Sequence, residues 1–340
     1  MERIFARVSA RTAISRLDIL LGICCWLFAG LLASCGGAWF SGVAAALAPP
    51  EAPQVHAAGN EEPITPIPAP PIADPWKLAL GERLFSDPRL SADGDLACSS
   101  CHDLHTNGAD GIERQVRKDG SRPPFDTLTV FNAALSFRLT WKGRFRDLAE
   151  QAEASIENPA DMHSNLTDVA RKLGSDPEMV WRFRVAYEQL PDRDNILDAL
   201  TTFERSLLTP DSRFDRWLRG DASALTPREL EGYNTFKSLG CISCHQGVNV
   251  GGNLFQRLGV FHSLTKGPPR IMRVPSLRNV ATTPPYFHDG SAATLEEAVR
   301  RMASAQLDRT LTDGQIESVV SFLKTLTGNY RGKPVVGRKS

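Results

Sequence analysis

The chain has 340 residues, of which 42% are apolar and 23% are charged, so it is long enough for two domains with hydrophobic cores. Its 39 basic and 39 acidic residues give a formal net charge of zero. This balance excludes a general, sequence-independent attraction to nucleic acid, because such binding depends on an excess of basic residues.

Residues 1–35 are typical of an export leader. Four arginines are spread over the first half of this segment, and an apolar run follows from Ile19 to Leu32. A basic region before an apolar one indicates export, and the run is short for a membrane span, which needs about 20 residues. Residues 32–35 resemble a lipobox, which would place a lipid on Cys35. Ordinary cleavage further on and an uncleaved apolar anchor are the alternatives, so we expect a periplasmic protein whose membrane anchoring is left open.

Residues 36–73 are rich in proline and alanine. This composition favours an extended, semi-rigid chain, so we expect a linker that tethers the folded body. The cysteines limit the body in another way. Of the 7 cysteines, three lie in the leader and the rest belong to two short motifs. No cysteine is therefore left for a structural disulfide.

The first domain, residues 74–208, carries one of these motifs as Cys98-Ser99-Ser100-Cys101-His102. The C-x-x-C-H pattern marks the attachment of a c-type haem. Both thiols form thioether bonds to the haem, and the histidine becomes the proximal iron ligand. We therefore expect Cys98, Cys101 and His102 to hold one haem. The apolar periodicity predicts helices over 77–85, 148–156, 166–173, 179–190 and 196–207.

The second domain, residues 209–330, repeats the motif as Cys241-Ile242-Ser243-Cys244-His245. Two copies at a domain-sized separation indicate two covalently bound haem c groups, the second held by Cys241, Cys244 and His245. Helices are predicted after Thr226, Thr294 and Thr312, each followed by a capping glutamate or glutamine. Residues 331–340 form a tail. The expected fold class is mostly α, with two cytochrome c-like helical domains behind the export signal and the proline-rich tether.

The function of each haem depends on the sixth position of its iron. A methionine thioether there raises the reduction potential and makes an electron-transfer haem, whereas an open position admits a small molecule. Met302 shares an apolar helical face with Leu295 and Ala298, which makes it a candidate ligand for the second haem. A plain core role and ligation by Met272 are the alternatives. Loop, surface or structural roles fit the remaining histidines of the two domains better: His105, His163, His262 and His288.

Several stretches between Leu80 and Gly328 match a known family. Besides the two haem motifs they are Leu84–Ser91, Thr129–Asn132, Trp141–Arg144, Leu207–Asp211, Cys241–Asn253, Val274–Val280 and Pro285–His288. On these stretches the chain resembles the bacterial di-haem cytochrome c peroxidases, a family that includes the methylamine-utilisation di-haem oxidases. The stretches are too long and too specific for a chance match.

The resemblance implies a division of labour between the two haems. The N-terminal haem, on His102, would be the low-potential peroxidatic centre. The C-terminal haem, on His245, would be the high-potential site of electron entry. Met302 falls in the family's axial-methionine segment, which favours it over Met272. The oxidase branch has tyrosine at this position, so methionine favours the peroxidase branch.

Three further residues match positions that act in the family. Trp141 corresponds to a tryptophan between the haems and would relay electrons, although a buried packing role is the alternative. Gln151 and Asp161 correspond to two positions beside the bound peroxide, the second of which is usually glutamate. Aspartate keeps the carboxyl group but is one methylene shorter, and general acid–base catalysis needs hydrogen-bond reach. The sequence therefore leaves open whether the shorter Asp161 side chain reaches the bound peroxide.

Two departures from the family pattern have consequences. In many members a histidine caps the peroxidatic iron until the other haem is reduced. Lys118 stands at that position, so we expect an iron that is open without reductive activation. The family's calcium site corresponds here to Asp126, Thr283 and Pro285. A carboxylate oxygen is a hard ligand that suits Ca²⁺, so we expect this site to persist.

The expected activity is the two-electron reduction of hydrogen peroxide to water, with electrons from a small cytochrome c or cupredoxin. One alternative is a di-haem oxidase that modifies side chains of a partner protein through a high-valent iron state. The missing capping histidine favours this alternative, and Met302 speaks against it. The other alternative is a non-enzymatic di-haem electron carrier, against which Gln151 and Asp161 weigh. A homodimer is implied by the resemblance alone.

Overall fold

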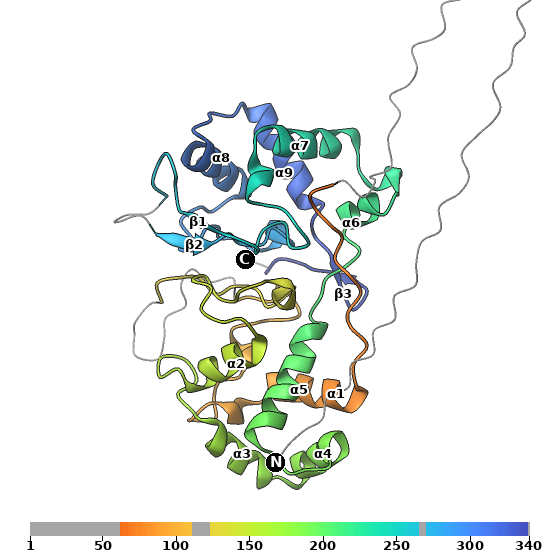
Figure 1. Ribbon diagram of the computed structural model, residues 1–340, viewed down its shortest axis with the longest axis vertical. Coiled ribbons are helices and arrows are strands. Elements are labelled where there is room, and N and C mark those ends of the chain that lie inside the picture. The colour runs from red at the N-terminus through yellow and green to blue at the C-terminus, as the bar shows by residue number, and fades with distance from the viewer. Residues whose placement is uncertain (1–61, 111–122, 265–269, 339–340) are drawn as a thin grey trace, which may run out of the picture. The chain divides into compact units, whose positions relative to one another are not determined.

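The computed structural model describes residues 62–110, 123–264 and 270–338, and these are mostly helical (Figure 1). The leader with Cys35, most of the tether and Lys118 lie outside the described residues. The helices are α1 Pro75–Phe85, α2 Leu148–Glu157, α3 Leu166–Gly174, α4 Pro177–Tyr187, α5 Arg193–Ser206, α6 Arg213–Leu218, α7 Pro227–Ser238, α8 Leu295–Leu307 and α9 Asp313–Lys324. Two short antiparallel pairs accompany them: β1 Phe255–Arg257 with β2 Ile271–Arg273, and β3 Asn329–Tyr330 with β4 Lys333–Pro334.

The prediction of a mostly α fold is confirmed. The helix that the sequence pattern missed is α6, because its 6 residues hold too little periodicity. Over the ranges described, no helix combines the length and the apolarity needed to cross a bilayer.

Side-chain caps determine where the helices of the second half begin. At the start of α7 the Glu229 N–H donates to Thr226 Oγ1 at 3.3 Å, and the Thr226 N–H donates to the Glu229 carboxylate at 2.8 Å. Thr312 and Gln315 exchange the same two bonds at the start of α9. These bonds satisfy N–H groups that the first helical turn leaves unpaired, so the capping patterns in the sequence place both helices correctly.

Two close helix crossings organise the body. Helix α1 crosses α5 at Gly81, where a Cβ atom would lie 2.0 Å from the carbonyl oxygen of Ala199. Helix α7 crosses α9 at Gly232, where a Cβ atom would lie 1.9 Å from the carbonyl oxygen of Ser318. Only glycine permits such an approach of two backbones. In Figure 1, α1 and α5 lie in the lower half and α7 and α9 in the upper half.

Each crossing lies in its own buried apolar cluster. The cluster of the first half contains the ring pair Phe85 and Phe203, with centroids 5.4 Å apart. The cluster of the second half contains the ring pair Phe236 and Phe322, with centroids 5.3 Å apart. The two pairs stand at the same places relative to the two glycines, which indicates that the halves are copies of one helical unit.

A pair of asparagines repeats in the same way. Asn132 and Asn279 both adopt the left-handed backbone conformation, with φ of 61° and 60°, just before a 3-10 turn. Both side-chain amides donate to Thr209 Oγ1, at 2.8 and 3.0 Å. Thr209, which follows α5 in the chain, therefore joins the two copies.

The difference in residue number between these asparagines also relates the segments that follow them. The isolated β-bridge between Leu139 and Phe145 corresponds in this way to the β-bridge between Tyr286 and Ala292. The same difference also relates the start of α2 to the start of α8. A residue in one copy can therefore be compared with its counterpart in the other.

The end of the expected tether is packed against the body. Ile64 and Ile67 are both buried, and Ile64 belongs to the apolar cluster of the second half. The backbone N–H of Ile67 donates to the Asp215 carboxylate at 3.2 Å. Residues 62–67 are thus part of the folded body, because their isoleucines pack in its interior. The proline-rich composition of the segment did not indicate this packing.

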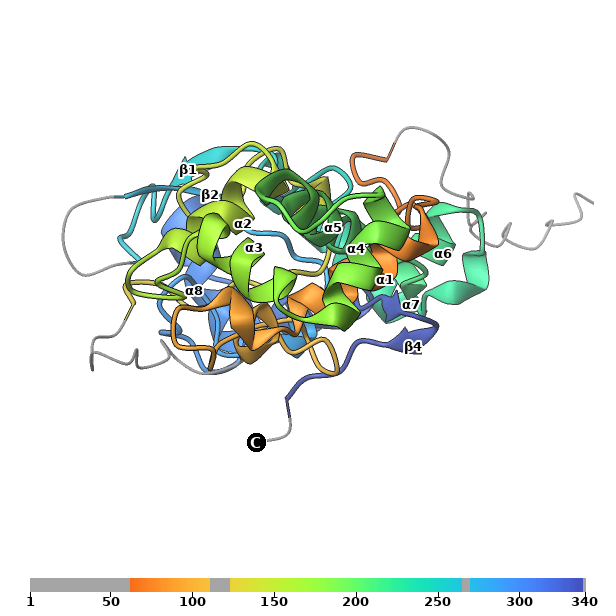
Figure 2. The ribbon, with the colours of Figure 1, turned by 90° about the horizontal axis from the view of Figure 1, so that it is seen from below.

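Residues 329–338, here called the C-terminal strap, cross back to the first half. Val335 is buried in the apolar cluster of the first half. The ring of Tyr330 packs on that of Phe131, with centroids 5.0 Å apart. Figure 2 shows this segment, with β4, running past α1. Residues 331–338, the described part of the predicted tail, are therefore packed against the body, since Val335 finds apolar partners in the first half.

Candidate haem sites

A cavity of about 930 Å³ reaches both haem-attachment motifs. Its walls are mainly apolar, as is typical of a cofactor site. The wall includes all the predicted attachment residues: Cys98, Cys101, His102, Cys241, Cys244 and His245. These four cysteines are free thiols and form no disulfide, which thioether formation requires.

Each motif folds into one tight turn. The N–H of His102 donates to the carbonyl oxygen of Cys98 at 3.0 Å, and the N–H of His245 donates to that of Cys241 at 3.1 Å. This bond brings the first cysteine and the histidine of each motif to the same side of the turn. The thiols can therefore anchor a ring whose face the imidazole meets.

Both imidazoles are oriented from behind by a backbone carbonyl. His102 Nδ1 lies 3.1 Å from the oxygen of Gly108, and His245 Nδ1 lies 3.2 Å from that of Val250. A proton on Nδ1 leaves the lone pair of Nε2 for a metal. Burial lowers the pKa of His245 to about 4 and also lowers the pKa of His102, so both rings are neutral near pH 7. The residues present thus fit a haem at each motif.

One difference between the two parts of the cavity wall lies at the corresponding positions of Met302 and Ser155. Helix α8 contributes Met302 to the wall, on the apolar face that the sequence predicts. The counterpart of Met302 on α2 is Ser155, whose Oγ accepts a hydrogen bond from Gln151 Nε2 at 2.8 Å. Met272, the alternative ligand, also lines the cavity but from β2, and it is almost fully buried.

Gln151 and Asp161 both line the part of the cavity that lies beside the first motif. Gln151 projects from α2, and Asp161 follows in the loop after α2, where its carboxylate accepts a hydrogen bond from the side-chain amide of Asn158. Burial raises the pKa of the Cys101 thiol, and the charge of Asp161 adds to this effect. The Asp161 carboxylate therefore lies within electrostatic reach of the first motif.

Trp141 lies where the two halves meet. Its indole N–H donates to the carbonyl oxygen of Asp126 at 2.9 Å, and its ring meets the ring of His288 edge-on, with centroids 6.3 Å apart. Trp141 and His288 are counterparts in the two copies, and Phe125 contacts both. Sequence reasoning singles out Trp141 and assigns His288 only a structural role. The offset in residue number that relates Asn132 to Asn279 also relates Trp141 to His288, and this is the signal that would have paired them.

The three residues expected to bind calcium, Asp126, Thr283 and Pro285, all line the cavity at this junction. The N–H of Asp126 donates to the carbonyl oxygen of His288 at 2.9 Å, which holds its loop beside residues 283–288. No group of three or more His, Cys, Asp or Glu side chains suited to a metal occurs in the part of the chain that the structure describes. A site built mainly from carbonyl oxygens and water is compatible with this finding.

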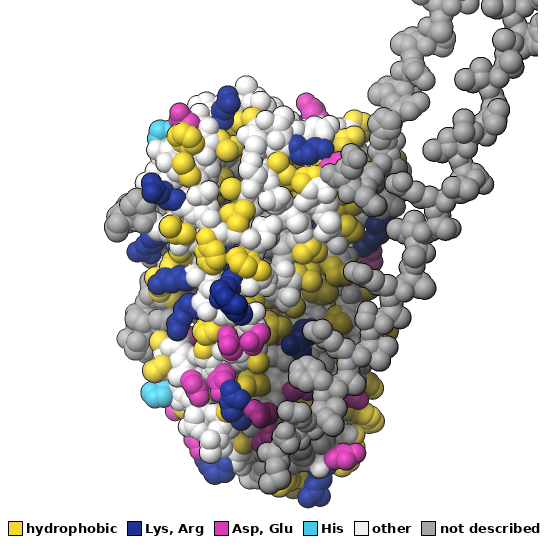
Figure 3. Space-filling view, in the orientation of Figure 1, with side chains coloured by type: hydrophobic (Ala, Val, Ile, Leu, Met, Phe, Trp, Pro, Cys, Tyr) yellow, Lys and Arg dark blue, Asp and Glu magenta, His cyan; other side chains and the backbone are white. Residues whose placement is uncertain are grey.

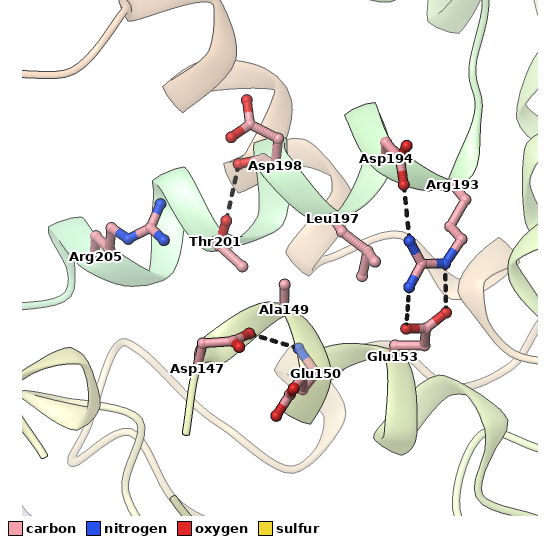
Figure 4. Close-up of a pocket in the computed structure, with 10 residues that line it drawn as sticks. All are labelled: Asp147, Ala149, Glu150, Glu153, Arg193, Asp194, Leu197, Asp198, Thr201 and Arg205. Carbon is pink, nitrogen blue, oxygen red and sulfur yellow. Dashed lines mark hydrogen bonds and ion pairs between the residues drawn. The ribbon is translucent and has the colours of Figure 1, made fainter. Parts of the chain in front are cut away.

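A smaller cleft lies on the outside of the first half, between α2 and α5 (Figure 4). Arg193 spans it and pairs with Glu153 at 2.5 Å and with Asp194 at 2.8 Å. The guanidinium of Arg205 also lies in this cleft. None of the residues that the sequence marks for chemistry lines it.

Comparison with known proteins places these features in context. Residues 75–223 match the family described as di-haem cytochrome c peroxidase. The chain is 41% identical over 283 residues to cytochrome c551 peroxidase of Nitrosomonas europaea, which covers 79% of this chain and 85% of that protein. It is 39% identical over 289 residues to cytochrome c peroxidase Ccp of Escherichia coli, covering 80% of this chain but only 62% of that protein. A solved structure of a MauG-like protein associated with microbial copper homeostasis is similar with a TM-score of 0.67 at 26% identity, covering 77% of this chain and 93% of that one.

Proposed function

This chain belongs to the di-haem cytochrome c peroxidase family, which includes the MauG branch, and on that basis we propose how its two halves divide the reaction. Membership makes the protein a peroxidase, an oxidoreductase with haem c as its cofactor. We propose that hydrogen peroxide is reduced beside His102 and that electrons enter beside His245. Because Lys118 replaces the capping histidine, the reaction needs no prior reductive activation.

The observation that carries this proposal is a difference at corresponding positions: α8 places Met302 where α2 places Ser155. A bound haem supplies the redox chemistry, since its iron accepts electrons singly and can activate a ligand at an open position. The Met302 side chain has the length and the soft thioether that such a position accepts. The Ser155 hydroxyl is shorter and is engaged by Gln151 at 2.8 Å. The first half therefore leaves room for a small oxidant, and the second half does not.

Gln151 and Asp161 would serve the peroxide in the first half. Reduction of hydrogen peroxide consumes two electrons and two protons and yields two molecules of water. Gln151, fixed by Ser155, orients the bound peroxide. Asp161 stands at the exposed edge of the cavity, where it can take protons from solvent and hand them on. A single water molecule can bridge the distance lost with the missing methylene.

An exposed apolar and basic surface beside the junction suits an electron donor. The rings of Phe137 and Phe255 pack together, with centroids 5.7 Å apart, and Ile271 on the neighbouring strand is 70% exposed. The exposed basic residues of this region are Lys142, Arg144, Arg146, Arg257 and Arg270. Figure 3 shows Lys and Arg side chains gathered among apolar ones at the height where Figure 1 labels β1 and β2.

We propose that this surface receives a small cytochrome c or cupredoxin whose apolar contact patch has an acidic rim. Opposite charges steer such encounters and make the association rate depend on salt. Trp141 then lies on the path between the halves, in contact with His288. Turnover with an acidic donor should fall as ionic strength rises, and a donor with a basic rim should show no such fall.

The test of the proposed function is turnover of hydrogen peroxide by the fully oxidised holoprotein with a reduced cytochrome c or cupredoxin. We expect rapid turnover without pre-reduction, and a loss of about 10²–10⁴-fold in Asp161→Asn, the usual contribution of a general acid–base group. Asp194→Asn, which removes an acid in the outer cleft, is the matched control and should leave turnover unchanged. Slow turnover with a long-lived oxidised state would instead support the protein-modifying oxidase. Inertness toward peroxide would support an electron carrier.

The open position in the first half has a spectroscopic test of its own. The all-ferric holoprotein should contain one haem without a second protein ligand. A spectrum with only six-coordinate low-spin haem would contradict the role given to Ser155 and Lys118.

We further propose that Ca²⁺ binds through Asp126, Thr283 and Pro285 at the junction. Carboxylate and carbonyl oxygens are the ligands that Ca²⁺ prefers. Chelation should then change the haem spectra, the activity or the oligomeric state, whereas no change in any of them would exclude the site. Export to the periplasm and a homodimer complete the proposal, and cell fractionation and sedimentation of the holoprotein test them.

A further inference from the structure

Glu204 is a partly exposed acid with one buried carboxylate oxygen, and the proposed reaction does not use it. It projects from α5 into the cavity at the first motif. Its Oε2 atom is buried, and no hydrogen-bond partner for that atom occurs among the described residues. A buried polar group without a partner costs free energy. Its presence in the haem cavity therefore calls for a reason.

The duplication shows which residue the same position holds in the other half. Ala199 and Ser318 correspond, because each meets the crossing glycine of its half. Phe203 and Phe322 correspond as well, since they form equivalent ring pairs. The residue after each phenylalanine is Glu204 in α5 and Leu323 in α9.

Both counterparts face the cavity. Leu200 and Glu204 stand one turn apart on α5 and both line it, and Val319 and Leu323 do the same on α9. The two haem pockets therefore share one design at this wall. They differ in that the first half places a carboxyl group where the second places an isobutyl group.

Glu204 is the ionisable side chain with which α5 lines the cavity. Burial of the carboxyl group raises the pKa of Glu204 to about 8. The charge of Arg205, whose side chain lies in the outer cleft (Figure 4), acts in the opposite direction but is the weaker effect. The charge of Glu204 acts in turn on Cys98, whose sulfur no longer titrates once it forms a thioether.

The helices packed on α5 present other charges, but none of these side chains lines the cavity. Lys77 of α1 pairs with Asp198 at 2.8 Å, and Glu153 of α2 pairs with Arg193 at 2.5 Å. Glu82 of α1 pairs with Arg331 of the strap at 2.7 Å. The ion pairs on α3 and at the end of α1, which join Asp168 with Arg171 and Arg83 with Asp87, are likewise formed away from the cavity wall.

We propose that the ionised Glu204 carboxylate lowers the reduction potential of the N-terminal haem relative to that of the C-terminal haem, so that this potential depends on pH. A negative charge near the iron stabilises the ferric form, which carries one more positive charge than the ferrous form. Reduction takes one electron from the donor, and near the pKa of Glu204 the carboxylate also takes up one proton from solvent. This inference rests on the proposed function, since above the pKa of Glu204 it adds to the lower potential that the division of labour assigns to the first half.

The experiment is a redox titration of the holoprotein, with each haem followed by its own spectrum, at pH values well below and well above the pKa of about 8. In the wild type the potential of the N-terminal haem should fall as the pH rises through this range. Glu204→Gln, which keeps the shape and removes the charge, should abolish the fall. At the alkaline end the Gln variant should hold about tenfold more reduced N-terminal haem at a fixed applied potential, the size expected for one partly screened charge nearby.

Leu323→Gln is the matched control, because it places the same neutral amide at the corresponding position of the second half. It should leave the pH dependence of both haems as in the wild type. Glu204→Leu copies the second half and provides a second variant if Glu204→Gln folds poorly. An unchanged pH dependence of the N-terminal potential in both Glu204 variants would overturn the inference. Peroxide turnover measured on the same samples separates that outcome from a failure of the proposed function, which would appear as inertness of the wild type.

Discussion

At the scale of single residues, Arg278 connects three distant segments. Its side chain is 1% exposed and pairs with Asp215, which is 0% exposed, at 2.8 Å. The same guanidinium donates to the backbone oxygens of Val248 and Thr65, both at 2.8 Å. Each of the three guanidinium nitrogens thus donates a hydrogen bond, which offsets the cost of burying the charge. Arg278 lies in one of the stretches that carry the family resemblance, so the stretch serves the fold as well as the site.

Arg278→Met should destabilise the protein by roughly 3–5 kcal/mol, because it leaves the Asp215 carboxylate buried without its partner. The free energy of unfolding from chemical denaturation measures this loss. Arg228→Met, which breaks the exposed ion pair with Glu317, is the control and should cost at most about 1 kcal/mol. Equal losses in the two variants would contradict the role given to Arg278.

Met302 carries a second prediction at this scale. Met302→Ser copies Ser155 and should remove the methionine-ligated signal of the C-terminal haem and lower its potential, because a thioether ligand raises the potential. Met272→Leu is the matched control, since it changes the other cavity-lining methionine of the second half. If Met272→Leu removed the signal and Met302→Ser did not, the assignment of the ligand would be reversed.

At the scale of elements, the two helix crossings set the distance between each helix pair and hence the depth of each haem pocket. The backbones touch at Gly81 and at Gly232, and the aromatic pairs lock the helices on either side. Residues that face the cavity, such as Glu204 and Leu323, are carried by the same two helices. A change in a crossing therefore moves the wall of a haem pocket.

Gly81→Ala and Gly232→Ala should each destabilise the protein by roughly 1–3 kcal/mol or more, because the added Cβ would lie within 2.0 Å of a backbone oxygen and neither helix can yield. Gly314→Ala is the control, since this glycine also lies in a helix but a Cβ there meets nothing within 4 Å. We expect it to be neutral or slightly stabilising. Thermal and chemical unfolding of the three variants measure the difference. Tolerance of alanine at both crossings would show that the close approach is not required.

At the scale of the whole described body, two terminal segments link regions that are far apart in the sequence. Residues 62–67 pack on the second half, and the C-terminal strap packs on the first. The strap is held by Val335 in the apolar cluster and by Arg331, which pairs with Glu82 at 2.7 Å. The first half thus depends for its core on residues from the very end of the described chain.

Val335→Ala should lower the stability of the first half by about 1–2 kcal/mol, at about 0.8 kcal/mol for each buried methyl or methylene group that is lost. Its neighbour offers a matched control, because Val335 is 5% exposed and Val336 is 52% exposed. Val336→Ala should therefore change little. Unfolding followed at the absorption of each haem should show the N-terminal haem affected first in Val335→Ala. A simultaneous change in the absorption of both haems would mean that the strap supports the body as a whole.

Local chemistry explains what the sequence by itself determined. The two C-x-x-C-H motifs, the caps of α7 and α9 and the mostly α fold class each depend on residues that are neighbours in the chain. A turn of five residues brings Cys98 to His102 by a single backbone bond, so no distant segment is needed to recognise it. Family membership followed from the same local stretches.

Tertiary structure alone decided the features that depend on segments far apart in the sequence. The contact of Trp141 with His288 and the packing of Ile64 and Val335 arise only when distant segments meet and bury their apolar faces. The placement of Glu204 near the first motif arises when α5 folds back within the first half. The correspondence of Ser155 with Met302, and of Glu204 with Leu323, likewise needs the register that the helix crossings fix. These contacts depend on how side chains pack in the folded protein. The order of residues along the chain does not show which distant side chains become neighbours.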